Sequence, residues 1–174
     1  RLGRAATCMG RVGDDGIGRR VLRELRAEGV ALHATVDASA RTGLMIKETP
    51  SAGSTRVLYY RTGSAGSRLN ADDLELDPIA SAGILHVTGI TLALSESAEH
   101  AVHVAGDWAV STGVPVSFDV NHRPSLWGGR DAGAVYRRIA ERATIVFAGD
   151  DEAELLVGAG SPEGMATALA ALGP

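Results

Sequence analysis

The chain has 174 residues, 45% of them hydrophobic, which is enough to build one compact core or a large part of one. Its formal net charge of −4 gives no basic footprint for nucleic acid, and no apolar run reaches the roughly 20 residues that a membrane span needs. The single cysteine, Cys8, cannot form an intramolecular disulfide. We therefore expect a cytoplasmic protein with neither a nucleic-acid nor a membrane partner.

Short apolar runs alternate with stretches at helical spacing, a pattern typical of an α/β fold with a largely parallel sheet. Residues 5–10 are predicted to form a strand, followed by a helix that begins at Asp15 and ends near Gly29. Cys8 lies in this strand, where we expect it to be buried in the core rather than to act as a nucleophile. The glycines of residues 10–18 match no phosphate-binding motif and indicate a tight turn.

Two strand-like runs follow, at residues 42–48 and 55–61, and the Pro and Gly between them predict a hairpin turn. Because this hairpin interrupts the alternation of strands and helices, we place it outside the main sheet. The expected organisation is a β-hairpin lid at residues 42–61 and an α/β core formed by residues 1–41 and 62–174.

The rest of the chain continues the alternation. Strands are predicted at residues 83–90, 115–120 and 144–149; the first is followed by a helix capped at Ser95 and the second by a helix at residues 131–143. A final helix is predicted at residues 161–172.

The predicted second strand of the hairpin carries the run YYR. Alternation along a strand puts Tyr59 and Arg61 on one face and Tyr60 on the other. A phenol beside a guanidinium suits a small ligand that bears hydroxyls and a carboxylate. Cross-strand packing, or a contact between two subunits, explains the same residues without a ligand.

A second candidate site follows the strand predicted at residues 115–120. Open α/β sheets bind ligands at the carboxyl ends of their strands, and here Asp119, Asn121 and Arg123 alternate in the sequence. On an extended chain they project to one side and are able to hold an oxyanion. The alternative is that the Asp and Asn side chains make turns before Pro124 and that the arginine is solvated.

Acidic residues gather at the start of the helix predicted after residue 149. Glu152 is a candidate Mg²⁺ ligand, acting through water as hard oxygen ligands do. The favourable interaction of acidic residues with the positive end of a helix explains the same cluster without a metal. The five histidines lack the spacing of a zinc site.

Several stretches, taken together, resemble the ribokinase-like (phosphofructokinase-B type) carbohydrate kinases, and in particular those that act on 2-keto-3-deoxygluconate. They are ARTGLMIKE, VLYYRTGSAGSRL, ILHVTGITLALSESA, PVSFDVNHRPSLW and DDEAELL. The resemblance runs through essentially the whole chain. It implies transfer of the ATP γ-phosphate to a sugar-acid hydroxyl, a ribokinase-like sheet flanked by helices, and a small β lid that forms the contact of a homo-oligomer.

The resemblance also implies roles for individual residues. It assigns the sugar acid to Tyr59, Arg61 and Arg123, with Met45 at a lid position where the related kinases often have an aromatic residue. It places Asn121, together with Arg123, near the ATP phosphates.

For the metal, the resemblance assigns Glu152 to Mg²⁺, and Gly149 stands where the N-x-x-E motif of the family usually has Asn or a small hydroxyl residue.

The catalytic aspartate of the family belongs to a G-A-G-D motif, which we expect beyond Pro174. We therefore interpret the chain as a portion of a longer kinase, shortened at both ends and nearly inactive alone, because a positioned base contributes about 10²- to 10⁴-fold to the rate. The alternatives are a kinase of the same fold for a neutral sugar such as fructose or ribose, and a catalytically silent sugar-binding homologue.

Overall fold

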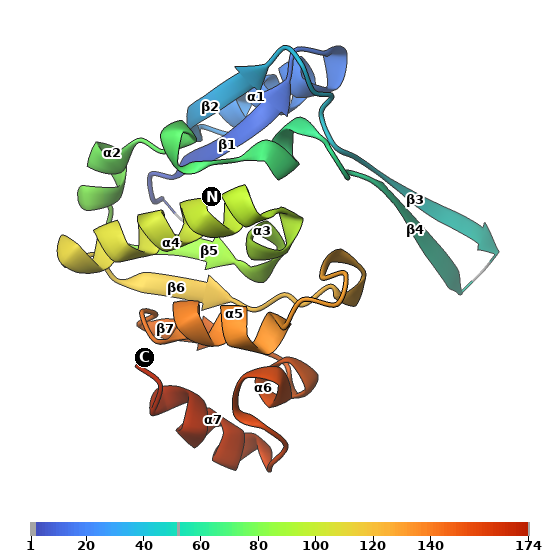
Figure 1. Cartoon of the computed structure of the whole chain (residues 1–174). Coiled ribbons are helices and arrows are strands. Elements are labelled where there is room, and N and C mark those ends of the chain that lie inside the picture. Colours follow the sequence, from blue (N-terminus) through green and yellow to red (C-terminus); the bar gives the residue numbers. More distant parts are fainter. Residues whose placement is uncertain (1–2, 52, 174) are drawn as a thin grey trace. The chain divides into compact units, whose positions relative to one another are not determined.

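The computed structural model describes residues 3–51 and 53–173. The chain divides into two compact units, Arg1–Leu74 and Glu75–Pro174, and each is described here by itself (Figure 1). Within the described ranges, no helix has the length and apolar character needed to cross a membrane.

The first unit begins with a β–α–β arrangement. Strands β1 (Thr7–Gly13) and β2 (Ala31–Asp37) pair in parallel and are connected by helix α1 (Gly16–Ala27). The Asp15 side chain caps this helix by accepting a hydrogen bond from its first turn, and Gly29, just past its end, has a φ of 80°. A left-handed residue at this position favours glycine. The predicted helix and both of its boundary residues are confirmed.

Two expectations for this unit are wrong. The strand β2 was not predicted from the sequence, and Cys8, which was expected to be buried, is exposed. Within the described residues β1 pairs with β2 alone. A sheet of two strands covers its members incompletely, and in β1 only Val12 and Gly13, at the end that contacts α1 and the following loops, are buried.

The predicted hairpin is present. Strand β3 (Leu44–Ser51) pairs antiparallel with β4 (Ser54–Tyr60), and in the described residues neither joins another sheet. The hairpin extends away from β1 and β2 as a narrow arm (Figure 1), and most of its side chains are exposed. It belongs to the first unit by its contacts, so its assignment as a separate lid stays a prediction.

An ionic cluster joins the two parallel strands to the short helices η1 (Ala65–Arg68) and η2 (Ala71–Asp73). The Arg11 guanidinium donates to Asp37 at 3.1 Å and to Asp73 at 3.0 Å. Hydrogen bonds from the side chain and backbone of Ser39, together with Arg11, lower the pKa of Asp37 to about 2. This carboxyl group is therefore ionised at neutral pH and ties the end of β2 to β1.

The second unit contains a parallel sheet in the order β5, β6, β7. These strands span Leu85–Thr88, Val116–Asp119 and Ile145–Phe147. The helical elements of this unit are α2 (Leu76–Ala80), α3 (Gly89–Leu94), α4 (Glu96–Ser111), η3 (Pro124–Leu126), α5 (Ala132–Ala140), α6 (Asp150–Val157) and α7 (Pro162–Ala170). The largest fully buried side chains are Tyr136, Phe118, Leu92 and Ile139, which come from β6 and the helices beside it.

The three strands and three longest helices predicted for this unit are confirmed, with one change. The strand predicted at residues 83–90 ends at Thr88, and α3 begins at the next residue. Ser95 caps α4 as expected, because its hydroxyl accepts a hydrogen bond from the Ala98 amide at 3.1 Å.

Candidate functional site

The first group of candidate residues shares one face of the hairpin. Met45 lies directly opposite Tyr59 across the two strands, and Leu44 lies opposite Tyr60 on the other face. The guanidinium carbon of Arg61 is 4.1 Å from the centroid of the Tyr59 ring. The predicted alternation is therefore observed, and Met45, Tyr59 and Arg61 form what we call the cationic face.

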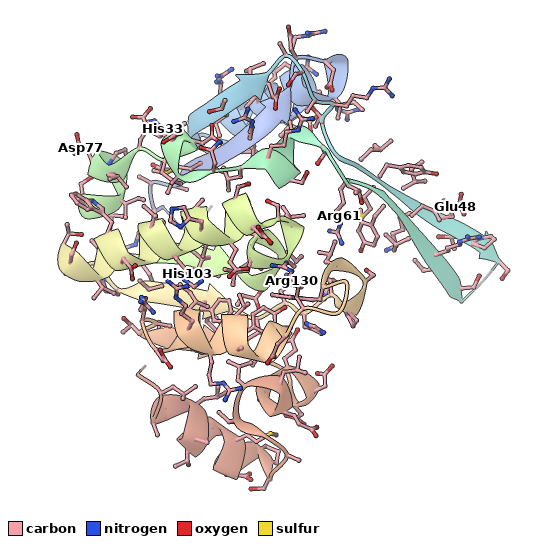
Figure 2. All side chains as sticks on the ribbon, viewed as in Figure 1. His33, Glu48, Arg61, Asp77, His103 and Arg130 are labelled. Atoms are coloured by element: carbon pink, nitrogen blue, oxygen red, sulfur yellow. The ribbon has the colours of Figure 1, made fainter. Side chains whose placement is uncertain are left out.

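The cationic face is open to solvent, except near Arg61. Met45 is 54% exposed and Tyr59 is 45% exposed, whereas the Nε atom of Arg61 is buried and has no hydrogen-bond partner among the described residues. Arg61 lies near the root of the hairpin, and Glu48 lies toward its tip (Figure 2). A fixed guanidinium beside an exposed phenol is able to bind an anion that also carries hydroxyl groups.

The second group of candidate residues follows β6. Asn121 has a φ of 40°, the only positive value for a non-glycine residue in the described ranges. The chain therefore turns after Val120, and the prediction that Asp119, Asn121 and Arg123 lie along one side of an extended segment is wrong. The Arg123 guanidinium bends back to its neighbour and donates to the carbonyl of His122 at 2.8 Å.

Glu152, in the first turn of α6, connects the loops that follow β6 and β7. Its Oε1 atom accepts a hydrogen bond from the His122 amide at 2.6 Å, and its Oε2 atom accepts one from the Gly149 amide at 2.9 Å. A carboxylate has about four acceptor positions, so two remain after these bonds. Glu152 is thus hydrogen-bonded to His122, the residue that directly follows Asn121.

An aromatic cluster packs against His122, in the loop that follows β6. The buried Tyr136 hydroxyl accepts a hydrogen bond from Trp127 Nε1 at 3.0 Å and lies 3.0 Å from His122 Nδ1. Burial raises the pKa of Tyr136 to about 12, so the phenol stays protonated. Arg130 lies over the Trp127 ring at 4.7 Å and also pairs with Glu99 at 2.8 Å.

These contacts of Tyr136 were not predicted from the sequence. Trp127 is buried, and its ring packs edge-on against Tyr136. The available signal was the large aromatic Tyr136 at a core-facing position of the helix predicted after Asp131.

The structure thus brings the predicted residues together in two groups, one in each unit. Met45, Tyr59 and Arg61 belong to the hairpin of the first unit, whereas Asn121, Arg123 and Glu152 belong to the second. Within the described ranges, no three His, Cys, Asp or Glu side chains are placed to hold a metal ion together. A metal at this position would depend on Glu152, on water and on a bound phosphate ligand.

A parallel sheet with polar groups after its strands is typical of the α/β proteins that bind ligands at the carboxyl ends of their strands. Comparison with known proteins defines the family. A family model described as "pfkB family carbohydrate kinase" matches residues 1–174. The chain belongs to the pfkB family of carbohydrate kinases.

Individual relatives agree with this family. The chain is 40% identical over 168 residues to a 2-dehydro-3-deoxygluconokinase of Thermoproteus tenax. The aligned region covers 92% of this chain and 50% of the relative. The chain is 34% identical over 165 residues to fructokinase-1 of Zea mays, and this aligned region covers 94% of this chain and 51% of the relative. The chain therefore spans about half the length of these curated relatives.

A solved structure has the same fold. The crystal structure of a PfkB protein from Polaromonas sp. JS666 matches with a TM-score of 0.93 at 34% identity, over 99% of this chain and 59% of that chain. The ribokinase-like α/β fold expected from the sequence is confirmed.

Proposed function

We propose that the protein encoded by the complete gene is an ATP-dependent kinase for a sugar acid, and that the acid is 2-keto-3-deoxygluconate. The observation that carries this proposal is the cationic face, where Arg61 lies over Tyr59 on an arm of a pfkB-family fold. The name of the Thermoproteus tenax relative, 2-dehydro-3-deoxygluconokinase, describes the same substrate.

In this proposal the cationic face binds the sugar acid. Arg61 pairs with the substrate carboxylate, and Tyr59 covers the carbon skeleton and hydrogen-bonds to a hydroxyl. Met45, opposite Tyr59, adds apolar contact beside the ring. Arg123, exposed after β6, supplies a second guanidinium for the acid or for the phosphates.

The loop after β6 and the first turn of α6 serve the nucleotide. Asn121 and Arg123 contact the ATP phosphates, and Glu152 contacts Mg²⁺ through water. The residues fit this ion, because Mg²⁺ retains several waters and usually takes only one or two protein carboxylates. When bound, Mg²⁺ neutralises charge on the transferred phosphoryl group. The residues of this chain orient the phosphates and keep the loop in its turned form.

The remaining parts of the proposal lie outside these contacts. We place the catalytic aspartate in sequence beyond Pro174 and place the protein in the cytoplasm. The exposed apolar side chains of the hairpin, among them Leu44, Ile46 and Tyr60, favour a homo-oligomer that forms through the lid.

A second candidate function is a kinase for a neutral sugar. The similarity to fructokinase-1 supports it, and such a kinase would have no carboxylate for Arg61 to pair with. A catalytically silent, sugar-binding form is the third candidate.

The experiment is a substrate panel with the protein made from the complete gene, in which ADP release is measured with sugar acids and neutral sugars. We expect turnover of 2-keto-3-deoxygluconate, and we expect Arg61→Ala to lower kcat/KM for the acid about 10- to 100-fold. Arg56→Ala is the matched control, because Arg56 lies on the opposite face, across from Glu48.

The panel separates the candidates. An equal loss on acids and neutral sugars in Arg61→Ala overturns the carboxylate contact. Activity on fructose or ribose alone supports the second candidate, and sugar binding without ADP release supports the third.

A further inference from the structure

The root of the hairpin, where β3 leaves the β–α–β part of the first unit, is held by an aspartate. Asp15, the residue that caps α1, accepts three hydrogen bonds there. Its Oδ1 atom accepts from the Gly18 amide at 2.7 Å and from the Thr42 hydroxyl at 2.9 Å, and its Oδ2 atom accepts from the Thr42 amide at 2.7 Å. The Thr42 hydroxyl oxygen in turn accepts from the Gly13 amide at 2.9 Å. Asp15 and Thr42 together form what we call the root clamp.

The root clamp is tightly packed. A side chain at Gly13 would place its Cβ 2.6 Å from the Thr42 nitrogen, and one at Gly18 would place it 2.8 Å from the Thr42 hydroxyl. Real Cβ atoms essentially never come this close, so both positions favour glycine. The hydrogen bonds from the backbone amides of Thr42 and Gly18 lower the pKa of Asp15, which keeps the acceptor ionised.

The other strand of the hairpin is tied to the same place. Where the chain returns after β4, the Ala65 amide donates to the carbonyl of Arg41 at 2.8 Å, and the Ser64 amide donates to the carbonyl of Arg61 at 3.0 Å. Ala65 is fully buried. A Cβ built at Gly43 would lie 3.5 Å from the Cβ of Arg61, so the backbone just before β3 closely approaches Arg61.

Beyond the root the arm has no comparable support. In the described residues β3 and β4 pair only with each other, and most of their side chains are exposed. The direction in which the arm leaves the first unit is therefore set by the few bonds at its root. A loss of these bonds would move the whole cationic face rather than one side chain.

We infer that Asp15 and Thr42 are positioning residues that fix the direction of the hairpin and hence the place of Tyr59 and Arg61. This inference rests on the proposed function for its catalytic consequence, because it assumes that the cationic face binds the sugar acid. The clamp itself is a property of the first unit. Neither residue contacts the substrate in this proposal.

Thr42 offers a matched pair of variants. Thr42→Val keeps the shape of the side chain but removes the hydroxyl, so both the Gly13 amide and Asp15 lose a partner. Thr42→Ser keeps the hydroxyl. Asp15→Asn, which sets an amide group against the Thr42 amide, is a second test of the same contact. Asp14→Asn is the control, because within residues 3–51 and 53–173 the Asp14 side chain makes only an exposed ion pair with Arg19.

Two measurements are made on the protein from the complete gene. In the first, hydrogen exchange of backbone amides is followed in the hairpin and in α4. We expect Thr42→Val and Asp15→Asn to speed exchange in residues 42–65 and to leave α4 unchanged, whereas Thr42→Ser and Asp14→Asn resemble the wild type. Equal exchange rates in Thr42→Val and the wild type would show that the root clamp does not hold the hairpin.

In the second measurement, KM and kcat are determined for both substrates. We expect Thr42→Val to raise KM for the sugar acid about tenfold, with KM for ATP unchanged, and Thr42→Ser to restore the wild-type value. A lower kcat together with higher KM values for both substrates would overturn the positioning role, because this result would indicate general destabilisation. If the wild type phosphorylates no sugar acid, the proposed function and the positioning role both fail, while the exchange experiment still decides whether the clamp holds the hairpin.

Discussion

Arg61 lies over the aromatic ring of Tyr59, with its guanidinium carbon 4.1 Å from the ring centroid. A cation over an aromatic ring is stabilised by the ring quadrupole, by about 0.5–1 kcal/mol at an exposed site. The contact therefore holds the guanidinium in one orientation before a ligand arrives, which reduces the side-chain entropy that binding must overcome.

This relationship gives the first prediction. Tyr59→Ala removes both the ring under Arg61 and the phenol, so we expect KM for the sugar acid to rise about tenfold, while Tyr59→Phe, which keeps the ring, has a smaller effect. Tyr60→Phe is the control because Tyr60 lies on the other face, and it should leave KM nearly unchanged. Steady-state kinetics with the complete protein measures all three variants. A similar rise in Tyr60→Phe would contradict the assignment of faces.

The second prediction concerns Glu152. Its two oxygens accept amide hydrogen bonds from different loops, and in Glu152→Gln the new NH₂ group must face one of those amides. We expect a loss of about 1 kcal/mol in the free energy of unfolding, together with a higher Mg²⁺ concentration for half-maximal activity. Urea unfolding and a Mg²⁺ titration measure the two effects.

Glu154→Gln is the matched control for that experiment, since Glu154 lies in the same helix with an exposed side chain. A Glu152→Gln variant that loses stability but keeps its Mg²⁺ dependence would restrict Glu152 to supporting the loops.

The third prediction concerns the buried hydroxyl of Tyr136. Tyr136→Phe leaves the buried Nε1 donor of Trp127 without its acceptor, and an unsatisfied buried donor is destabilising by about 1–3 kcal/mol. We expect a decrease of this size in the free energy of unfolding, measured in urea with the 174-residue chain. Tyr60→Phe, at an exposed tyrosine, should show no decrease; an equal change in both variants would argue against the hydrogen bonds of Tyr136.

The fourth prediction is a pH dependence that arises from His103. This side chain of α4 is buried, and neither ring nitrogen has a hydrogen-bond partner among the described residues; Glu99 Oε1 lies 3.9 Å away. Burial, with a further contribution from Arg138 and Arg142, lowers the pKa of His103 from 6.5 to about 4. In the folded protein the ring is therefore neutral at neutral pH.

The sign of this pH dependence follows from the difference in proton uptake between the folded and unfolded chains. Between pH 6.5 and about 4 the unfolded chain binds a proton at His103 that the folded chain does not, so stability falls as the pH falls through this range. The loss is on the order of 3 kcal/mol in full. His103→Leu should flatten this part of the curve, whereas His100→Asn, at an exposed histidine of the same helix, should not. Urea unfolding at several pH values measures the effect, and an unchanged slope in His103→Leu would contradict it.

Local sequence was enough to predict the structure where contacts within one turn determine it. The helices with a side-chain cap at Asp15 and Ser95 were predicted with their starting residues, because a cap is a contact within one turn. β2 was missed because its residues ALHATVD include two alanines and lack a clear alternation, and its pairing with β1 decides its conformation. The strand predicted at residues 83–90 extended into the first two residues of α3, because Ile90 is β-branched, whereas the burial of Leu92 favours the helix.

The candidate site shows the same limit. Alternation along β4 predicted the common face of Tyr59 and Arg61, since both lie on or next to one regular strand. The same reasoning failed after β6, because the left-handed Asn121 ends the extended segment. The bond from the His122 amide to Glu152 joins residues 30 positions apart, and the bond from the Thr42 amide to Asp15 joins residues 27 positions apart, so no local pattern indicates them.

The exposure of the hairpin has a consequence for evolution within the family. Substitutions at exposed positions usually change stability by no more than about 0.5 kcal/mol, so the arm can change its ligand-facing residues without weakening the core of its unit. Its fixed root keeps each new face in the same place. The hairpin is therefore a segment in which substrate preference can diverge between related genes, and a graft of residues 44–61, which includes the whole cationic face, would transfer that preference as a single piece.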